Sequence, residues 1–193
     1  MKRSVLGMLS LAVCIGFAGC KSKPNADSDN SMFDYMQKQV AKLGEEGKIA
    51  SVGIGQSRDQ ALAIDRASVD ARTKLAQAAQ VKVENLQKAF IEEIGEAESS
   101  EINQIFSSAT KQITAQTLQG TVPLEQTFDD EGGVFTAYVL MVQNPDIVDM
   151  VIKNNSNNAQ HLYERFRASK AFEELDKEIK EFEAAEREGM LGI

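Results

Sequence analysis

Apolar residues recur at helical spacing between residues 32 and 43. Neighbouring apolar positions there lie one to four residues apart, and Gly44 and Gly47 follow. This spacing places the apolar side chains on one face of a helix, and glycine commonly marks a helix end. The apolar residues are Met32, Phe33, Met36, Val40 and Leu43. The pattern predicts a short amphipathic helix within residues 32–47.

The period then changes to two. Ala50, Val52 and Ile54 alternate with Ser51 and Gly53, which predicts a strand over residues 48–55. A new helix is expected directly afterwards. Ser57 is a suitable N-cap and Gln60 stands three residues later, which is the spacing of a capping box.

A long helical pattern follows, with small and apolar residues on one face and charged residues beside it. The inward positions are Ala61, Ile64, Ser68, Ala71, Leu75 and Ala78. Such a face is typical of a helix that lies closely against a sheet. The pattern continues through Phe90 and Ile94 to Gly95, and a second helical segment is expected from about Ser100 to Thr114.

A hairpin is predicted next. Apolar residues occupy even positions from Leu118 to Phe128, residues 129–133 read as a turn, and residues 134–142 are almost continuously apolar. The second strand is therefore expected to be buried on both faces. Pro123 cannot donate a hydrogen bond to a neighbouring strand, so it indicates an edge position or a bulge in the first strand.

The remaining chain is expected to be helical. Asn144 and Pro145 are suited to start a short helix, and an asparagine-rich break covers residues 154–158. The segment from Ala159 to Glu188 carries apolar residues three or four apart and acid-first ion pairs with i,i+4 spacing. This last helix either docks on its own domain or forms a coiled-coil seam with another copy, and its two heptads leave both alternatives open.

Together these elements predict an α+β fold. A strand, a long helix and a hairpin would form a small antiparallel sheet with helices on one face. This domain would cover residues 48–153. The helix at residues 32–47 precedes it, and the amphipathic helical segment at residues 154–193 follows it.

The N-terminus predicts export and lipidation. Lys2 and Arg3 precede an apolar stretch that is too short to serve as a spanning helix but fits a signal peptide over residues 1–19. Phe17-Ala18-Gly19-Cys20 resembles a bacterial lipobox. This resemblance implies cleavage before Cys20, diacylglycerol on its sulfur and an acyl chain such as palmitate on its amine. The alternative is an ordinary signal peptide in which Cys20 is incidental.

Several acyl chains together would hold the mature protein stably on a membrane. Residues 20–31 are polar apart from single small residues, and they are expected to form a flexible tether behind the lipid. Lys21, in place of aspartate, resembles the signal for the outer membrane in lipoprotein sorting. We expect the domain to face the periplasm.

The composition of the mature chain argues against nucleic-acid binding, an internal disulfide and a transmembrane helix. Cleavage would leave 174 of the 193 residues and would change the formal net charge from −8 to −10, because Lys2 and Arg3 leave. So acidic a chain is not expected to bind nucleic acid. Cys14 would also be removed, so Cys20 would be the one remaining cysteine and no internal disulfide is expected. No later apolar run reaches the roughly 20 residues that a transmembrane helix needs.

Three features were weighed as candidate sites. Gly53-Ile54-Gly55-Gln56-Ser57-Arg58 has two glycines of a dinucleotide-binding turn but Arg58 at the third, so close packing is the better interpretation. His161 is the single histidine, and without a second ligand beside it a metal site is not expected. The acidic residues 129–131 do not have calcium-loop spacing. We expect no catalytic residue, no cofactor and no metal, and hence no enzyme.

Residues 48–143 resemble the LPP-twenty family of bacterial surface lipoproteins. The resemblance rests on Ala50-Ser51-Val52-Gly53-Ile54-Gly55, on Ala61, Ala67 and the segment Asp70-Ala71-Arg72-Thr73-Lys74-Leu75-Ala76, and on Thr136-Ala137-Tyr138-Val139-Leu140. It implies a non-enzymatic envelope lipoprotein, and some relatives contribute to flagellar basal structures. The helices at both ends lie outside the resemblance.

The sequence therefore predicts a lipid-anchored outer-membrane protein that acts as an envelope scaffold through contacts with other envelope proteins or with its own copies. The alternative is a periplasmic module that binds a small molecule or a cell-wall component between helix and sheet. That alternative predicts a concave apolar pocket with a few converging polar groups.

Overall fold

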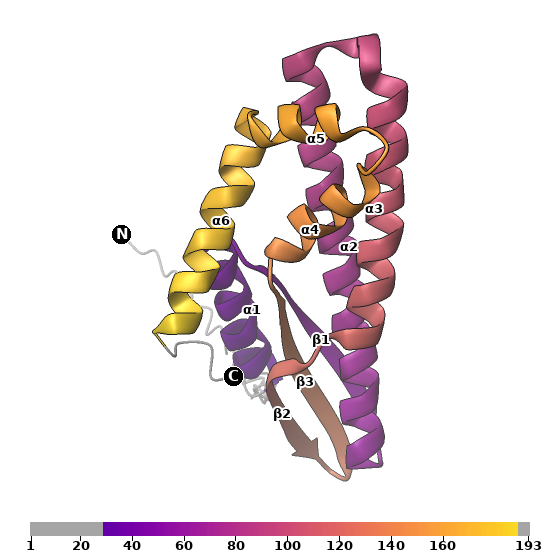
Figure 1. Cartoon of the computed structure of the whole chain (residues 1–193). Coiled ribbons are helices and arrows are strands. Elements are labelled where there is room, and N and C mark those ends of the chain that lie inside the picture. Colours follow the sequence, from indigo (N-terminus) through magenta and orange to yellow (C-terminus); the bar gives the residue numbers. More distant parts are fainter. Residues whose placement is uncertain (1–28, 189–193) are drawn as a thin grey trace, which may run out of the picture.

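The computed structural model describes residues 29–188 of the chain. These residues form a three-stranded sheet and a set of helices, which Figure 1 labels in chain order. The first half contains α1 Asp29–Glu45, β1 Ile49–Ser57, α2 Gln60–Ile94, the 3-10 turn η1 Glu96–Glu98 and α3 Ser99–Gly120. The second half contains β2 Pro123–Glu131, β3 Val134–Gln143, α4 Asp146–Asn155, α5 Gln160–Arg167 and α6 Lys170–Arg187. The fold is α+β, as the sequence predicts.

The sheet is antiparallel throughout and has the order β1-β3-β2. The central strand β3 is buried along most of its length, which confirms the prediction from its continuous apolar run. Strand β2 lies at one edge, and its register against β3 shifts between Pro123 and Glu125. Both alternatives drawn from Pro123, an edge position and a bulge, are therefore present together.

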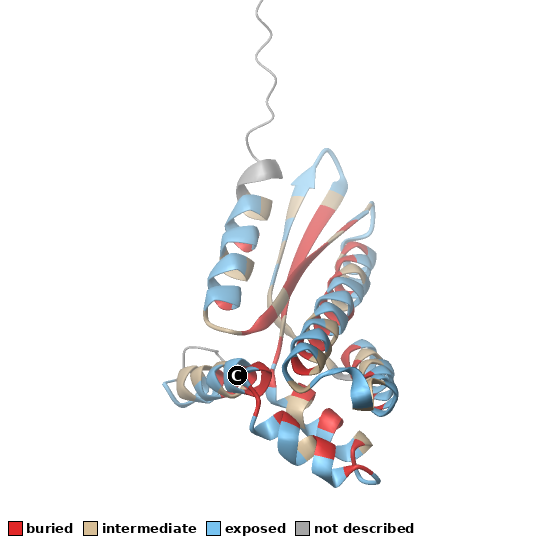
Figure 2. Ribbon diagram, turned by 90° about the horizontal axis from the view of Figure 1, so that it is seen from above, coloured by how far each residue is buried: buried red, intermediate tan, exposed pale blue. Residues whose placement is uncertain are grey.

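Helices cover both faces of the sheet, whereas the sequence predicts helices on one face only. Helix α2 packs on one face, where Ala67, Ala71 and Val139 belong to the main core. Helix α1 packs on the other face, where Met36 and Leu140 belong to a separate, smaller core. Figure 1 and Figure 2 show α1 and α2 on opposite sides of the strands. The alternation of β1 was the signal for this arrangement, because Val52 and Ile54 point away from α2 and need a cover of their own.

Helix α2 is continuous for 35 residues and extends well beyond the sheet. Helix α3 returns beside it, and α4 and α5 pack across this helical pair (Figure 1). Aromatic rings fill the space between them. The Phe166 ring lies edge-on to three others, at centroid distances of 5.4 Å to Phe90, 5.6 Å to Phe106 and 5.4 Å to Phe172. These side chains anchor the C-terminal helices to the distal half of α2.

Two helix boundaries differ from the predictions before the hairpin. Helix α2 is capped by Asp59, whose carboxylate accepts the Leu62 N–H at 2.9 Å, and not by Ser57, which still belongs to β1. Helix α3 continues to Gly120, whereas the alternation from Leu118 to Phe128 predicts a strand there. Leu118 and Val122 lie four residues apart, a spacing that fits a helix turn as well as a strand, so the pattern was ambiguous at this point.

The C-terminal segment also differs from its prediction. It forms two helices, because the Ser169 side chain caps a new helix by accepting the Phe172 N–H at 3.3 Å. Helix α6 is docked on its own chain: Phe172, Leu175 and Ile179 belong to the main core. The apolar residues that would form a coiled-coil seam are thus occupied within the protein.

Candidate functional site

The predicted lipidation site lies outside the described residues. Cys20 and the lipobox before it precede Asp29, the first residue of α1. The described chain thus begins with the helix that covers the smaller core, a short distance in sequence after Cys20. Within residues 29–188, no helix combines the length and the apolar character that crossing a membrane requires.

The two glycines of β1 are packing residues. A Cβ atom on Gly53 would lie 2.8 Å from the Ala71 Cα atom and still closer to the Ala67 carbonyl oxygen. A Cβ atom on Gly55 would lie 2.7 Å from the Arg66 Cβ atom. The backbones of β1 and α2 are therefore in direct contact, as the packing interpretation of these glycines predicts. Both glycines lie inside the strand and not in a turn after it.

The close approach of α2 to β1 argues against the ligand-binding alternative at this position. The alternative places a pocket between helix and sheet, but at β1 the helix backbone fills that position. A groove of about 650 Å³ lies elsewhere, between the outer faces of α2 and α3. Its lining is Gln80, Glu84, Gln87, Ser107, Thr110, Lys111, Thr114, Ala115 and Leu118. This groove is open to solvent and most of its lining residues have polar or charged side chains, although apolar atoms make up the larger part of its surface. It lies outside the helix–sheet interface, where the alternative expects an apolar pocket.

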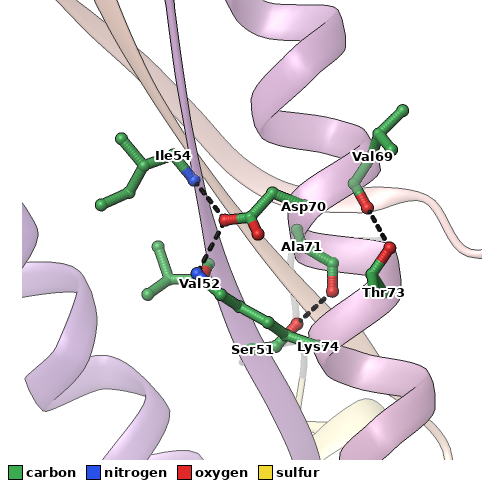
Figure 3. Close-up of polar contacts among 8 residues, drawn as sticks. All are labelled: Ser51, Val52, Ile54, Val69, Asp70, Ala71, Thr73 and Lys74. Atoms are coloured by element: carbon green, nitrogen blue, oxygen red, sulfur yellow. Dashed lines mark hydrogen bonds and ion pairs between the residues drawn. The ribbon is translucent and has the colours of Figure 1, made fainter.

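The outer edge of β1 is covered by three side chains of α2. Lys74 donates to the Val52 carbonyl at 3.3 Å, and the Asp70 carboxylate accepts the Ile54 N–H at 2.9 Å. Arg66 donates to the Gln56 carbonyl at 2.6 Å. Figure 3 shows Asp70 and Lys74 reaching from the helix to this edge. The Lys74 ammonium also donates to the Asp70 carboxylate, at 2.7 Å. An edge strand is open to pairing with another chain unless its outward backbone groups are occupied, and on β1 three of these groups, the Val52 and Gln56 carbonyls and the Ile54 N–H, are bonded by α2.

The signal for this cover was present in the sequence. Arg66, Asp70 and Lys74 follow one another at intervals of four, so they form one stripe along a helix. The stripe reads as a solvated flank of the helix when the sequence is considered alone. Its contact with β1 depends on how α2 crosses the sheet, and sequence spacing does not specify that crossing.

The opposite edge of the sheet, on β2, is different. Among residues 29–188, the three bonds to β1 have no counterpart along the outer side of β2 between Leu124 and Asp130. Apolar side chains are also exposed there: Val122 is 75% exposed, Phe128 is 40% exposed and Val134 is 38% exposed. Figure 2 shows the burial concentrated along the central strand and the hairpin end exposed. Val134, the first residue of β3, lies beside the turn. We define the β2 edge surface as Val122, Glu125, Phe128 and Asp129.

The hairpin tip was predicted as a five-residue turn but is tighter. Strand β2 extends to Glu131, and only Gly132 and Gly133 form the turn, with φ of 62° and 82°. Positive φ at both central residues is characteristic of the tightest hairpin turns. The Asp130 carboxylate accepts the Gly133 N–H at 3.0 Å and so supports the turn. The acidic residues 129–131 therefore belong to the edge strand, where they give the β2 edge surface its charge.

The remaining candidate groups lie in the C-terminal helices. His161 is exposed on α5, and within the described part of the chain no group of three or more His, Cys, Asp or Glu residues is placed to hold a metal ion. Tyr163 donates to the Asp149 carboxylate at 2.9 Å. Burial, together with this carboxylate, raises the pKa of Tyr163 from its ordinary value of 10.0 to about 12. Arg167 also contacts Asp149, and its guanidinium lies 4.1 Å above the centre of the Phe172 ring. These bonds join α4, α5 and α6.

Comparison with known proteins yields no match to a family model, to a curated protein or to a solved structure.

Proposed function

We propose that the protein is a lipid-anchored lipoprotein of the bacterial outer membrane that serves as a non-enzymatic scaffold or assembly component of the envelope. The observation that carries this proposal is the N-terminal sequence, in which a basic start, an apolar stretch and Phe17-Ala18-Gly19-Cys20 follow one another. A lipid on Cys20 would hold the domain at a membrane surface, facing the periplasm.

The resemblance of residues 48–143 to LPP-twenty lipoproteins supports the same proposal and includes a role in flagellar basal structures among the options. The fold is compatible with a role that depends on contacts with other proteins. The β2 edge exposes apolar residues and backbone groups, while side chains of α2 contact the β1 edge. Exposed apolar side chains next to an open strand edge are features of surfaces that bind other proteins.

The test of anchoring compares the native protein with the Cys20→Ser variant in fractionated cells. We expect the native protein in the outer-membrane fraction and the variant in the soluble periplasmic fraction, because the variant cannot carry the thioether-linked diacylglycerol. Mass spectrometry of the native N-terminal peptide should show the added acyl mass. An unmodified Cys20 thiol, or unchanged fractionation of the variant, would refute the anchor.

The test of the scaffold role uses mild crosslinking of intact cells before solubilisation. We expect defined crosslinked species that contain this protein and another envelope protein, or several copies of this one. The Cys20→Ser variant is the control, since it has the same fold but should be released from the membrane surface. A protein that remains an isolated monomer in both cases would contradict the scaffold role.

A further inference from the structure

The two edge strands of the sheet differ in how far other parts of the chain contact their outward backbone groups. Three α2 side chains, Arg66, Asp70 and Lys74, bond the outward backbone groups of β1. Between Leu124 and Asp130, strand β2 has no such cover among the described residues, and alternate residues of an edge strand direct their N–H and C=O groups outward. Because these bonds obstruct pairing at β1, the β2 edge is the more accessible place for an additional strand.

Apolar side chains flank this open edge and could contact an added strand. Val122 lies just before β2, and Phe128 and Val134 lie along the hairpin. Phe128 packs against Phe135 on the neighbouring strand, with ring centroids 5.9 Å apart, so part of its ring is held in position while 40% of the residue stays exposed. A strand paired to β2 would cover these side chains with its own alternate residues.

The negative charge of β2 favours a partner strand that carries positive charge. Between Pro123 and Glu131 the strand contains four carboxylates and no lysine or arginine. Asp129 strengthens the preference, because its Oδ2 atom is shielded from solvent and has no hydrogen-bond partner among the described residues. Opposite charges on paired strands stabilise the pairing and like charges oppose it, so a basic strand is favoured.

A second copy of this chain is a poor occupant of the same edge. Because α2 side chains obstruct the β1 edge, the favoured edge-to-edge pairing of two copies would join β2 to β2, antiparallel about a twofold axis. Pairing centred on Thr127 would place Glu125 opposite Asp129 twice. Pairing centred on Phe128 would place Glu125 opposite Glu131 twice. Each of these central registers brings carboxylates together.

We infer that the open edge of β2 binds an extended, lysine- or arginine-bearing segment of another envelope protein, which adds to the sheet as a fourth strand. The inference rests on the proposed scaffold function and gives the chemistry of its partner. Main-chain hydrogen bonds to β2 would provide affinity. Basic side chains next to Glu125 and Asp129, and apolar ones next to Phe128, would provide specificity.

The test uses a defined peptide and the full lipidated protein in a non-ionic detergent. The probe is a capped peptide of nine residues, the length of β2, with alternating lysine and valine. A peptide of alternating glutamate and valine is the control for charge, and titration into detergent alone is the blank. We expect calorimetry to show saturable binding of the basic peptide, and hydrogen exchange to show new protection of β2 amides. Absence of binding, or protection elsewhere than β2, would overturn the inference.

Matched variants separate the β2 site from general attraction to an acidic protein. Glu125→Lys combined with Asp129→Asn changes the charge by three units at β2. Glu92→Lys combined with Glu101→Gln makes the same change at the α2–α3 end, which Figure 1 shows at the opposite end of the molecule. We expect the first pair to weaken binding about tenfold and the second to leave it within about twofold, because cross-strand charge pairs act at short range. Equal effects of the two pairs would refute the β2 site.

Proline substitution tests strand pairing itself. In adjacent residues of β2, one N–H faces β3 and the other faces outward, so Gln126→Pro and Thr127→Pro should differ in stability. The variant that keeps the native melting temperature carries proline on the outward side, and we expect it to lose binding of the basic peptide. Retained binding by that variant would contradict pairing at β2.

The outcomes also distinguish this inference from the proposed function. If the peptide fails to bind while Cys20 is lipidated and crosslinked partners are found, the inference of a fourth strand is refuted and the proposed scaffold function stands. Concentration-dependent self-association with protection of β2 in the absence of peptide would show that a second copy occupies the edge, and would overturn the basic partner.

Discussion

Replacement of Gly53 by alanine tests the contact that defines the fold, the direct approach of α2 to β1. A Cβ atom at this position would lie 2.8 Å or less from three backbone atoms of α2 that belong to Ala67 and Ala71. Carbon atoms prefer separations of about 3.5–4.0 Å, so the helix would have to withdraw by about 1 Å. A backbone cannot rotate away as the end of a flexible side chain can, and the whole helix must move.

The magnitude follows from that movement. A gap of 0.5–1 Å forfeits about a quarter to a half of each dispersion contact across it. Buried residues along this face of α2, including Ala63 and Leu75, would lose part of their packing against the sheet. Overpacking of a well-packed core costs about 1–3 kcal/mol and sometimes more. We expect the upper end, about 3 kcal/mol, because the clash involves only backbone atoms. For a chain of this size that corresponds to a melting temperature lower by about 6–12 °C.

Gly44→Ala is the matched control. Gly44 lies in the last turn of α1, and a Cβ atom there would have no heavy atom within 4 Å. Alanine in place of helical glycine restricts the unfolded chain and favours the helix, so we expect a gain of about 0.4–1 kcal/mol. Urea and thermal unfolding of the Cys20→Ser protein, followed by far-UV circular dichroism, would measure both variants. If Gly53→Ala were as stable as Gly44→Ala, the proposed backbone contact between β1 and α2 would be refuted.

Two further predictions concern polar contacts. Removal of the Asp70 carboxylate in Asp70→Ala should leave the Ile54 N–H without its partner, lower the free energy of unfolding by about 1–2 kcal/mol and accelerate exchange of the Ile54 amide. Asp65→Ala, on the exposed side of the same helix, should do neither, and equal effects would contradict the edge contact. The second prediction concerns pH. The pKa of Tyr163 is raised to about 12 in the folded protein, so the protonated hydroxyl stabilises the fold. This stabilisation should be complete below pH 10 and should fall between pH 10 and pH 12. The difference in unfolding free energy between the native protein and Tyr163→Phe should therefore shrink in that range, and a constant difference would contradict the buried bond to Asp149.

Sequence patterns predicted most elements of the fold because each has a periodicity of its own. The α2 pattern extends to Ile94, and the structure has a single helix to that residue. The almost continuous apolar run of β3 predicted a strand buried on both faces, since a strand with one face in solvent would alternate apolar and polar residues. Patterns were least informative where two periods coincide, as at Leu118 and Val122, and α3 proved to be longer there than predicted.

The candidate site was less accessible to sequence analysis. The acidic residues of the hairpin were visible as a cluster, but they were assigned to a turn, whereas the structure places Asp129 and Asp130 in an edge strand. Their position on the open edge depends on strand order, which alternation within a single strand does not contain. The cover of the β1 edge by Asp70 likewise depends on the path of α2 across the sheet.

What the sequence determined by itself is local: the period of most helices and strands, and the glycines that leave room for a neighbouring backbone at Gly53 and Gly55. These features are local because they depend on residues a few positions apart in the chain. The tertiary structure alone decided that α1 covers the second face of the sheet, that one edge is covered and that the other is open. Those relations join residues that are far apart in sequence, and they arise only when the apolar faces of separate elements are buried against one another.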